Sequence, residues 1–104
     1  MVSIKPAHLQ IVMAILKDFA PECEVRVFGS RFTGKVKDYS DLDLVLLADT
    51  PLGWKRMARI EEAFQDSILP YRVDVLDWYA ISPQFQKVIE ESGFEVIQTK
   101  KQNL

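Results

Sequence analysis

Two neighbouring segments are the most informative part of this sequence: Gly29-Ser30-Arg31-Phe32-Thr33-Gly34 and, a few residues later, Ser40-Asp41-Leu42-Asp43-Leu44. They predict a passage from one apolar strand, through a small-residue turn, into a second apolar strand that carries two carboxylates. Asp41 and Asp43 are two residues apart, so on a strand both point to the same face, with Cα atoms about 6–7 Å apart. Such a pair repels itself unless a proton or a cation lies between the carboxylates. Mg²⁺ suits it, because this ion takes oxygen ligands from carboxylates and substrate phosphates.

The Gly-Ser turn adds a second part to the same candidate site. A turn of this kind between a strand and a short helix offers backbone N–H groups and a hydroxyl to a phosphate. Gly29 lacks a Cβ, which lets the backbone approach a ligand closely. Ser30 is expected to cap the short helix, and Gly34 to end it. Arg31, beside Ser30, is the best basic candidate for neutralising phosphate charge.

Plainer interpretations exist for each of these residues. Asp41 could cap the start of a strand, and Asp43 could be a solvated residue on a sheet edge. Gly29-Ser30 could be only a strand-to-helix turn, and a basic loop is common on protein surfaces. The occurrence of a phosphate cradle and a carboxylate pair within one short segment favours the functional interpretation.

The spacing Gly-Ser-x3-Gly-x5-Ser-Asp-x-Asp resembles the signature of nucleotidyltransferases of the DNA polymerase beta-like superfamily. Within it, the closest resemblance is to the minimal nucleotidyltransferases, small proteins that consist of the catalytic domain alone. With each residue type at roughly 5–7%, the five Gly, Ser and Asp positions would match by chance less than about once in a million placements. The motif covers under a fifth of the chain, but the order of predicted elements extends the resemblance to nearly all of it.

The resemblance implies transfer of a nucleoside monophosphate, most simply AMP from ATP, to an acceptor hydroxyl. By family analogy, Asp41 and Asp43 hold the metal on the triphosphate and share a second metal. Asp74 completes the second site of this two-metal Mg²⁺ arrangement, where the acceptor hydroxyl is activated. Gly29 and Ser30 would hold the β- and γ-phosphates. The implied fold is α/β (α+β), with a mixed β-sheet covered by helices.

Asp74 is the third acidic candidate because it interrupts the apolar segment Tyr71 to Leu76. A carboxylate in a central strand is costly unless it is paired or bound to a metal. The alternative to a metal is a salt bridge to Arg72 or Arg26. Asp77, three residues further on, is expected to face the opposite side of the strand.

Apolar periodicity and the positions of proline and glycine predict the remaining elements. Helices are expected from Pro6 to Phe19, from Trp54 to Ile68 and from Ser82-Pro83 to Gly93. Their apolar spacing places Phe19, Ile68 and Val88, respectively, on the sides that face the core. Strands are expected over Glu24 to Phe28, Leu42 to Ala48, Tyr71 to Leu76 and Phe94 to Ile97. This order predicts one sheet covered by helices, in a single catalytic domain over residues 1–98, with a polar tail over residues 99–104.

Composition narrows the function classes. The chain has 104 residues and a net charge of −2, so no basic field draws it to nucleic acid or an anionic membrane. Cys23 is the only cysteine, which excludes a disulfide within the chain. No apolar run reaches the ~18 residues of a membrane span, and a cytoplasmic location is the default expectation. His8, near the start of the first helix, is expected to be a plain surface residue.

The chain offers no second domain for choosing an acceptor, so the acceptor must be small or be brought by a partner. Minimal nucleotidyltransferases resemble the antitoxin half of two-gene modules whose partner is an all-helical HEPN-domain protein, and some add AMP to a tyrosine of that partner. Trp54, Trp78 and Tyr79 would suit such an interface, although aromatic residues are more often core. The competing function is a non-catalytic, nucleotide-binding module that masks its partner stoichiometrically.

Overall fold

The computed structural model describes residues 2–37 and 39–100. The helices are α1 (Pro6–Phe19), α2 (Ser30–Thr33), α3 (Trp54–Gln65) and α4 (Pro83–Ser92), with a 3-10 turn η1 (Trp78–Ala80); the strands are β1 (Glu24–Phe28), β2 (Leu42–Leu47), β3 (Val73–Asp77) and β4 (Glu95–Gln98). Most of the predicted polar tail, residues 101–104, lies outside the described residues. Within the described part, no helix has the length and apolar character needed to cross a membrane.

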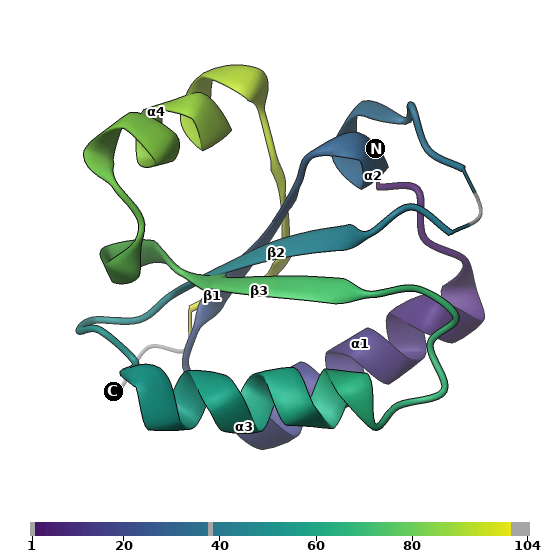
Figure 1. Ribbon diagram of the computed structural model, residues 1–104, viewed down its shortest axis with the longest axis horizontal. Helices are drawn as coiled ribbons and strands as arrows, with labels where there is room; N and C mark the ends of the chain where they lie inside the picture. The colour runs from purple at the N-terminus through teal and green to yellow at the C-terminus, as the bar shows by residue number, and fades with distance from the viewer. Residues whose placement is uncertain (1, 38, 101–104) are drawn as a thin grey trace.

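The strands form one mixed sheet in the order β3-β2-β1-β4. β2 and β3 run parallel, and β1 pairs antiparallel with both β2 and β4 (Figure 1). The parallel pair is joined through α3, which supplies the long crossover that such a pair requires. The prediction of a single α+β domain with a mixed sheet covered by helices is confirmed.

One face of the sheet is closed by α1 and α3, which lie side by side beneath it in Figure 1. Alternation along the strands turns every second side chain to this face. The fully buried core residues here include Val12, Leu16, Val25, Val27, Leu42, Leu44, Leu46 and Ile60. The expectation that Phe19 also faces the core is wrong, since its side chain is 41% exposed at the last position of α1.

The predicted helix from Trp54 to Ile68 ends earlier, at Gln65. The Ser67 hydroxyl donates to the Phe64 carbonyl and accepts from the Leu69 N–H. Such local side-chain bonds compete with helical ones. Ile68 therefore falls outside the helix and is 87% exposed, which contradicts its predicted place in the apolar stripe.

The opposite face of the sheet is covered only at one end, by α4 (Figure 1). Ile89 of α4 is buried, and the Phe85 ring meets the Phe28 ring edge-to-face, with centroids 6.1 Å apart. Val88 was predicted to face inward, but it is 56% exposed. Because α4 is short and buries so little, the rest of this face stays open, and the predicted carboxylates lie there.

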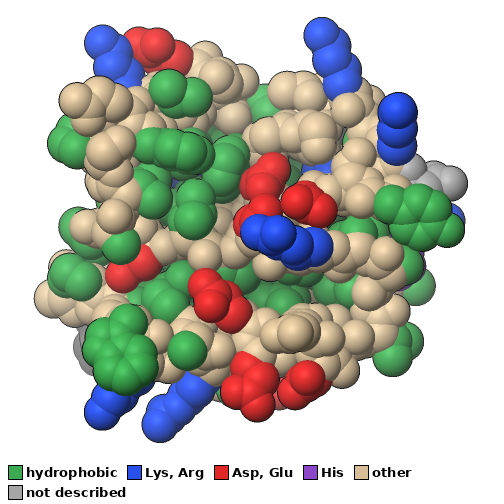
Figure 2. Space-filling view, viewed as in Figure 1, with side chains coloured by type: hydrophobic (Ala, Val, Ile, Leu, Met, Phe, Trp, Pro, Cys, Tyr) green, Lys and Arg blue, Asp and Glu red, His purple; other side chains and the backbone are tan. Residues whose placement is uncertain are grey.

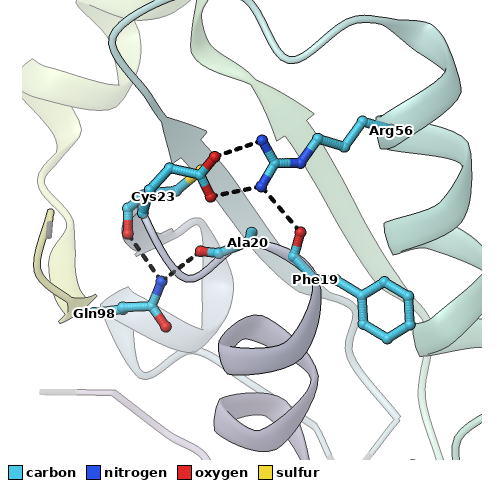
Figure 3. A network of polar contacts seen from close by, with 6 residues as sticks. Phe19, Ala20, Cys23, Arg56 and Gln98 are labelled. Atoms are coloured by element: carbon cyan, nitrogen blue, oxygen red, sulfur yellow. Dashed lines mark hydrogen bonds and ion pairs between the residues drawn. The ribbon is translucent and has the colours of Figure 1, made fainter.

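The turn between α1 and β1 is held by hydrogen bonds from two side chains, those of Gln98 and Arg56 (Figure 3). The Gln98 side-chain amide donates to the backbone carbonyls of Ala20 and Cys23, at 2.8 and 2.9 Å. Arg56 of α3 forms a fork onto both carboxylate oxygens of Glu22, at 2.5 and 2.6 Å. Cys23 is fully buried beneath this turn, and burial raises the pKa of its thiol to about 11.

Candidate active site

The register of the parallel pair brings two of the three predicted acids together. Asp43 of β2 lies opposite Asp74 of β3, and neighbouring strands are about 4.8 Å apart. Both side chains are half-buried and face the open side of the sheet. Asp41 precedes the first residue of β2 and is exposed. All three acids therefore come from one end of the parallel pair.

Gly29 lies directly against this carboxylate pair. Its φ is +74°, in a region that side chains rarely adopt, and a Cβ added there would overlap Oδ2 of Asp43. Glycine is required for two independent reasons, the backbone conformation and the lack of space. Gly29 therefore lies against a carboxylate of the site, and its approach to a ligand stays a prediction.

Asp43 carries the largest electrostatic cost at this site. The pKa of its carboxyl is raised from the ordinary 3.8 to about 6, first by burial and then by the charges of Asp74 and Asp41. Arg72 acts in the opposite direction, but more weakly. An ionised Asp43 would be stabilised by an additional cation, because all of the raising causes disfavour its negative charge.

Asp74 is paired with Arg72, the first of the two partners that the sequence suggested as an alternative to a metal. Nε and Nη2 of Arg72 lie 2.8 and 2.6 Å from the same oxygen, Oδ1 of Asp74. Arg26, the other suggested partner, is paired with Glu24 instead, with its guanidinium 4.1 Å from the centre of the Phe94 ring.

The carboxylate oxygens of these acids are suitable ligands for a hard cation, but the three side chains are not arranged around one point. Among residues 2–37 and 39–100, no three acidic, histidine or cysteine side chains are gathered in the arrangement of a metal site. Asp43 and Asp74 supply oxygen ligands side by side, and the raised pKa of Asp43 records charge that lacks compensation. Oxygen donors in a crowded anionic pair are what Mg²⁺ requires.

Ser30 does not cap α2 as predicted. Gly29 holds the N-cap position, and Ser30 is the first helical residue, with its carbonyl accepting from the Gly34 N–H and the Thr33 hydroxyl. The expectation failed because the turn needs a positive φ before the helix, and glycine supplies it at low cost. Ser30 is half-buried beside Gly29, and Gly34 ends the helix in the left-handed conformation, as predicted.

Arg31 has a different environment from the one expected of a phosphate ligand. It is only 6% exposed, with its guanidinium 3.8 Å from the centre of the Tyr71 ring. It donates to the Ser40 carbonyl at 2.7 and 3.0 Å and to the Ser3 carbonyl at 2.9 Å. Arg31 therefore holds the segment that leads into Asp41, and its role here is positional.

Two residues outside the site, Asp77 and His8, also had predicted environments. Asp77 faces away from Asp74, as expected, and accepts from the N–H groups of Leu52 and Tyr79. His8 is not the plain surface residue that was expected, because its ring meets the Tyr71 ring edge-on at 5.5 Å.

A groove of about 940 Å³ lies along the acids and around the edge strand β3. Its lining includes Phe28, Asp43, Asp74, Leu76 and Phe85 on the open face, and Glu61, Phe64 and Gln65 from α3. Figure 2 shows acidic side chains gathered about a basic one near the middle of this face, with apolar surface beside them. Sequence reasoning missed Phe28 and Phe85 as parts of the site. The sequence did place Phe28 directly before Gly29, which could have indicated that it lies at the site. In the structure Phe28 pairs with Asp43.

Comparison with known proteins identifies the family. A family model described as "Polymerase beta, Nucleotidyltransferase" matches residues 12–102. The chain belongs to this family. The predicted membership and the predicted nucleotidyltransferase activity are thereby confirmed.

Individual relatives of this nucleotidyltransferase are informative. It is 44% identical over 101 residues to a probable protein adenylyltransferase MntA of Haemophilus influenzae, covering 97% of this chain and 88% of the relative. Its fold matches a crystal structure of a toxin-antitoxin with AMP-PNP, with a TM-score of 0.68, 24% identity, and coverage of 84% of this chain and 69% of that one. It also matches a mutant toxin-antitoxin MntA-HpeT, with a TM-score of 0.67, 20% identity, and coverage of 88% and 72%.

Proposed function

We propose that this nucleotidyltransferase transfers AMP from ATP to a hydroxyl of a partner protein, in a reaction that depends on Mg²⁺. The observation that carries the proposal is the Asp43–Asp74 register pair, set against Gly29 and next to Asp41. Support for the acceptor class comes from the relative of 44% identity, which is described as a probable protein adenylyltransferase. Residues 1–98 would form the catalytic domain.

In this proposal the acids and the glycine turn divide the work. Asp41 and Asp43 would hold the metal that accompanies the triphosphate and would share a second metal, whose site Asp74 would complete. When bound, Mg²⁺ supplies positive charge that offsets charge developing on the attacking and leaving oxygens. Gly29 and Ser30 hold the β- and γ-phosphates. Arg31, committed to the carbonyls of Ser3 and Ser40, is omitted from the nucleotide ligands.

The reaction is an in-line displacement at the α-phosphorus. The acceptor oxygen forms a bond to this phosphorus, the bond to the β-phosphate oxygen breaks, and pyrophosphate leaves. The proton of the acceptor hydroxyl would pass to the carboxylate of Asp74, which helps to activate the acceptor, and from there to solvent. The half-buried Asp43 keeps the reacting groups close to fixed charges, where electrostatic stabilisation is largest.

The proposed partner is a helical HEPN-type protein, and this chain would be the antitoxin of the pair. Two fold neighbours are crystal structures described as toxin-antitoxin complexes, which is why this class of partner is chosen. A docked partner would supply the acceptor by proximity, an effect worth several kcal/mol in such reactions. No stable nucleic-acid binding is expected, because the chain has a net charge of −2.

The experiment is intact-mass spectrometry of the partner after incubation with this protein, ATP and Mg²⁺. The expected result is a mass gain of one or more AMP groups, which Asp43→Asn abolishes without loss of the fold. Asp66→Asn serves as the matched control, since Asp66 is an exposed aspartate at the end of α3. This variant should transfer AMP at the wild-type rate.

The competing function, masking without catalysis, predicts a different pattern. A stable complex with no mass gain, together with full neutralisation of the partner by the Asp43→Asn variant, would establish masking and overturn the transfer proposal. The absence of any complex, combined with ATP turnover on small hydroxyl compounds, would replace the protein acceptor with a small molecule.

A further inference from the structure

Arg72 holds a position among the three acids that the proposed reaction does not yet use. Both of its contacting nitrogens lie on one oxygen, Oδ1 of Asp74, at 2.6 and 2.8 Å. Its guanidinium also senses the charges of Asp41 and Asp43, which together with Asp74 raise its pKa. Arg72 is therefore a cation placed where the proposed function places a metal.

The backbone of Arg72 is fixed, whereas its side chain is not enclosed. The Arg72 carbonyl accepts from the Leu42 N–H at 2.9 Å, which ties the residue to the start of β2 between Asp41 and Asp43. The Arg72 side chain is 74% exposed, against 32% for the side chain of Asp74. The guanidinium can thus leave Asp74 for solvent by rotation of its own side chain, with no change in the strands.

We propose that Arg72 is a built-in counter-ion of this site, which pairs with Asp74 until a metal displaces it. This inference rests on the proposed function, since it assumes that these carboxylates bind a divalent ion. The three acids are not gathered around one point in the described residues, and Asp74 is the one of them that an arginine holds. Asp74 is held by an arginine and joins the other acids only when the arginine leaves.

The counter-ion has a definite consequence for binding. A metal that arrives alone must break the Arg72–Asp74 pair, and the guanidinium's positive charge opposes it at short range. A metal that arrives with a triphosphate brings negative charge for the released guanidinium to face. Arg72 therefore weakens the binding of free metal more than the binding of the metal–nucleotide complex, which reserves the site for the substrate. Arg72 acts through Asp74 and is a positioning residue.

The test measures Mn²⁺ binding to the full chain without nucleotide, by electron paramagnetic resonance of the free ion. Arg72→Gln should bind Mn²⁺ more tightly, by about threefold or more at low salt, and the difference should shrink as salt screens the charges. Arg72→Lys, which keeps the charge, should stay close to wild type. Arg59→Gln removes the same charge from an exposed site on α3 and should leave the affinity unchanged.

A second comparison separates the counter-ion role from a structural one. In the Asp74→Asn background, Arg72→Gln should no longer tighten Mn²⁺ binding, because the pair is already broken. A structural role for Arg72 would instead weaken Mn²⁺ binding and lower the melting temperature together.

Each other outcome has a clear meaning. Equal or weaker binding by Arg72→Gln, with Asp43→Asn still abolishing binding, would overturn the counter-ion role and leave the proposed function intact. No Mn²⁺ binding by wild type or by Arg72→Gln, with or without ATP, would overturn both.

Discussion

The two faces of β2 differ sharply in burial and in charge. Leu42, Leu44 and Leu46 are fully buried on the face closed by α1 and α3. Asp43, between two of them in sequence, faces the open side with a raised pKa and a carboxylate neighbour. A single strand thus supports stability with one set of residues and chemistry with the other, because its side chains alternate.

Burial of the leucines on the closed face offsets the electrostatic cost of Asp43 on the open face. Asp43 on the open side carries an electrostatic cost, while the leucines on either side of it remove apolar surface from water, a contribution of about 1.5–3 kcal/mol for each fully buried side chain. The strand can therefore hold a crowded carboxylate in place. Substitutions of Leu44 and of Asp43, on opposite faces of the strand, should have opposite effects on the free energy of unfolding.

The largest expected effect is on the closed face. Leu44→Ala removes a fully buried side chain and should lower the free energy of unfolding by about 2–5 kcal/mol. Ile68→Ala, at a residue that is 87% exposed, is the matched control and should change it by less than about 0.5 kcal/mol. Urea unfolding followed by circular dichroism measures both. Equal losses in the two variants would mean that the two faces are not divided as described.

The next effect is on the open face and has the opposite sign. Asp43→Asn removes a charge that the fold disfavours, so without divalent ions it should raise the free energy of unfolding at pH 8. The shift from 3.8 to about 6 corresponds to nearly 3 kcal/mol in full. Because the side chain is only half-buried, we expect about 1 kcal/mol.

The pH dependence provides the check on this prediction. Below about pH 3 the carboxyl is mostly neutral in both the folded and the unfolded chain, so the cost vanishes. As pH rises from 3.8 through about 6, the unfolded chain releases its proton first, and wild type loses stability relative to the variant. A difference between wild type and Asp43→Asn that is constant from pH 4 to pH 8 would contradict the raised pKa.

The smallest effect concerns Glu22, on the same side of the sheet as α3. The hydrogen bonds from Arg56 lower the pKa of the Glu22 carboxyl, so its contribution is present at neutral pH and is lost as pH falls through the lowered value. The Glu22 side chain is 46% exposed, so Glu22→Gln should cost only a few tenths of a kcal/mol at pH 7. Thermal unfolding at pH 7 and pH 3 measures this. A growing cost at pH 3 would reverse the assignment.

Much of the fold could be predicted from sequence because its signals are local. Pro6, Gly29 and the Ser82-Pro83 pair mark where elements begin, and the alternation around Asp43 gives its face. The site residues Asp43 and Asp74 were placed on neighbouring strands by their resemblance to a known motif. Their catalytic and metal-binding roles stay predictions.

Some of the errors came from contacts between segments far apart in the chain. The partners of Arg31 include Ser3, 28 residues away, and Tyr71, and nothing in the local sequence announces them. Val88 follows the helical period but is 56% exposed, so periodicity alone assigned it wrongly to the core. Sequence patterns describe which face of an element is apolar, whereas packing decides how much of that face is covered.

Labelling of the single, buried thiol of Cys23 can report local opening of the protein. Cys23 is sealed by the turn that Gln98 and Arg56 fasten, and burial suppresses its thiolate. A thiol reagent can modify it only during excursions in which this end of the sheet separates. The rate of labelling at low reagent concentration would then measure how often this end of the sheet opens, without an engineered cysteine. The same measurement in the presence of a partner would reveal whether docking holds that end shut.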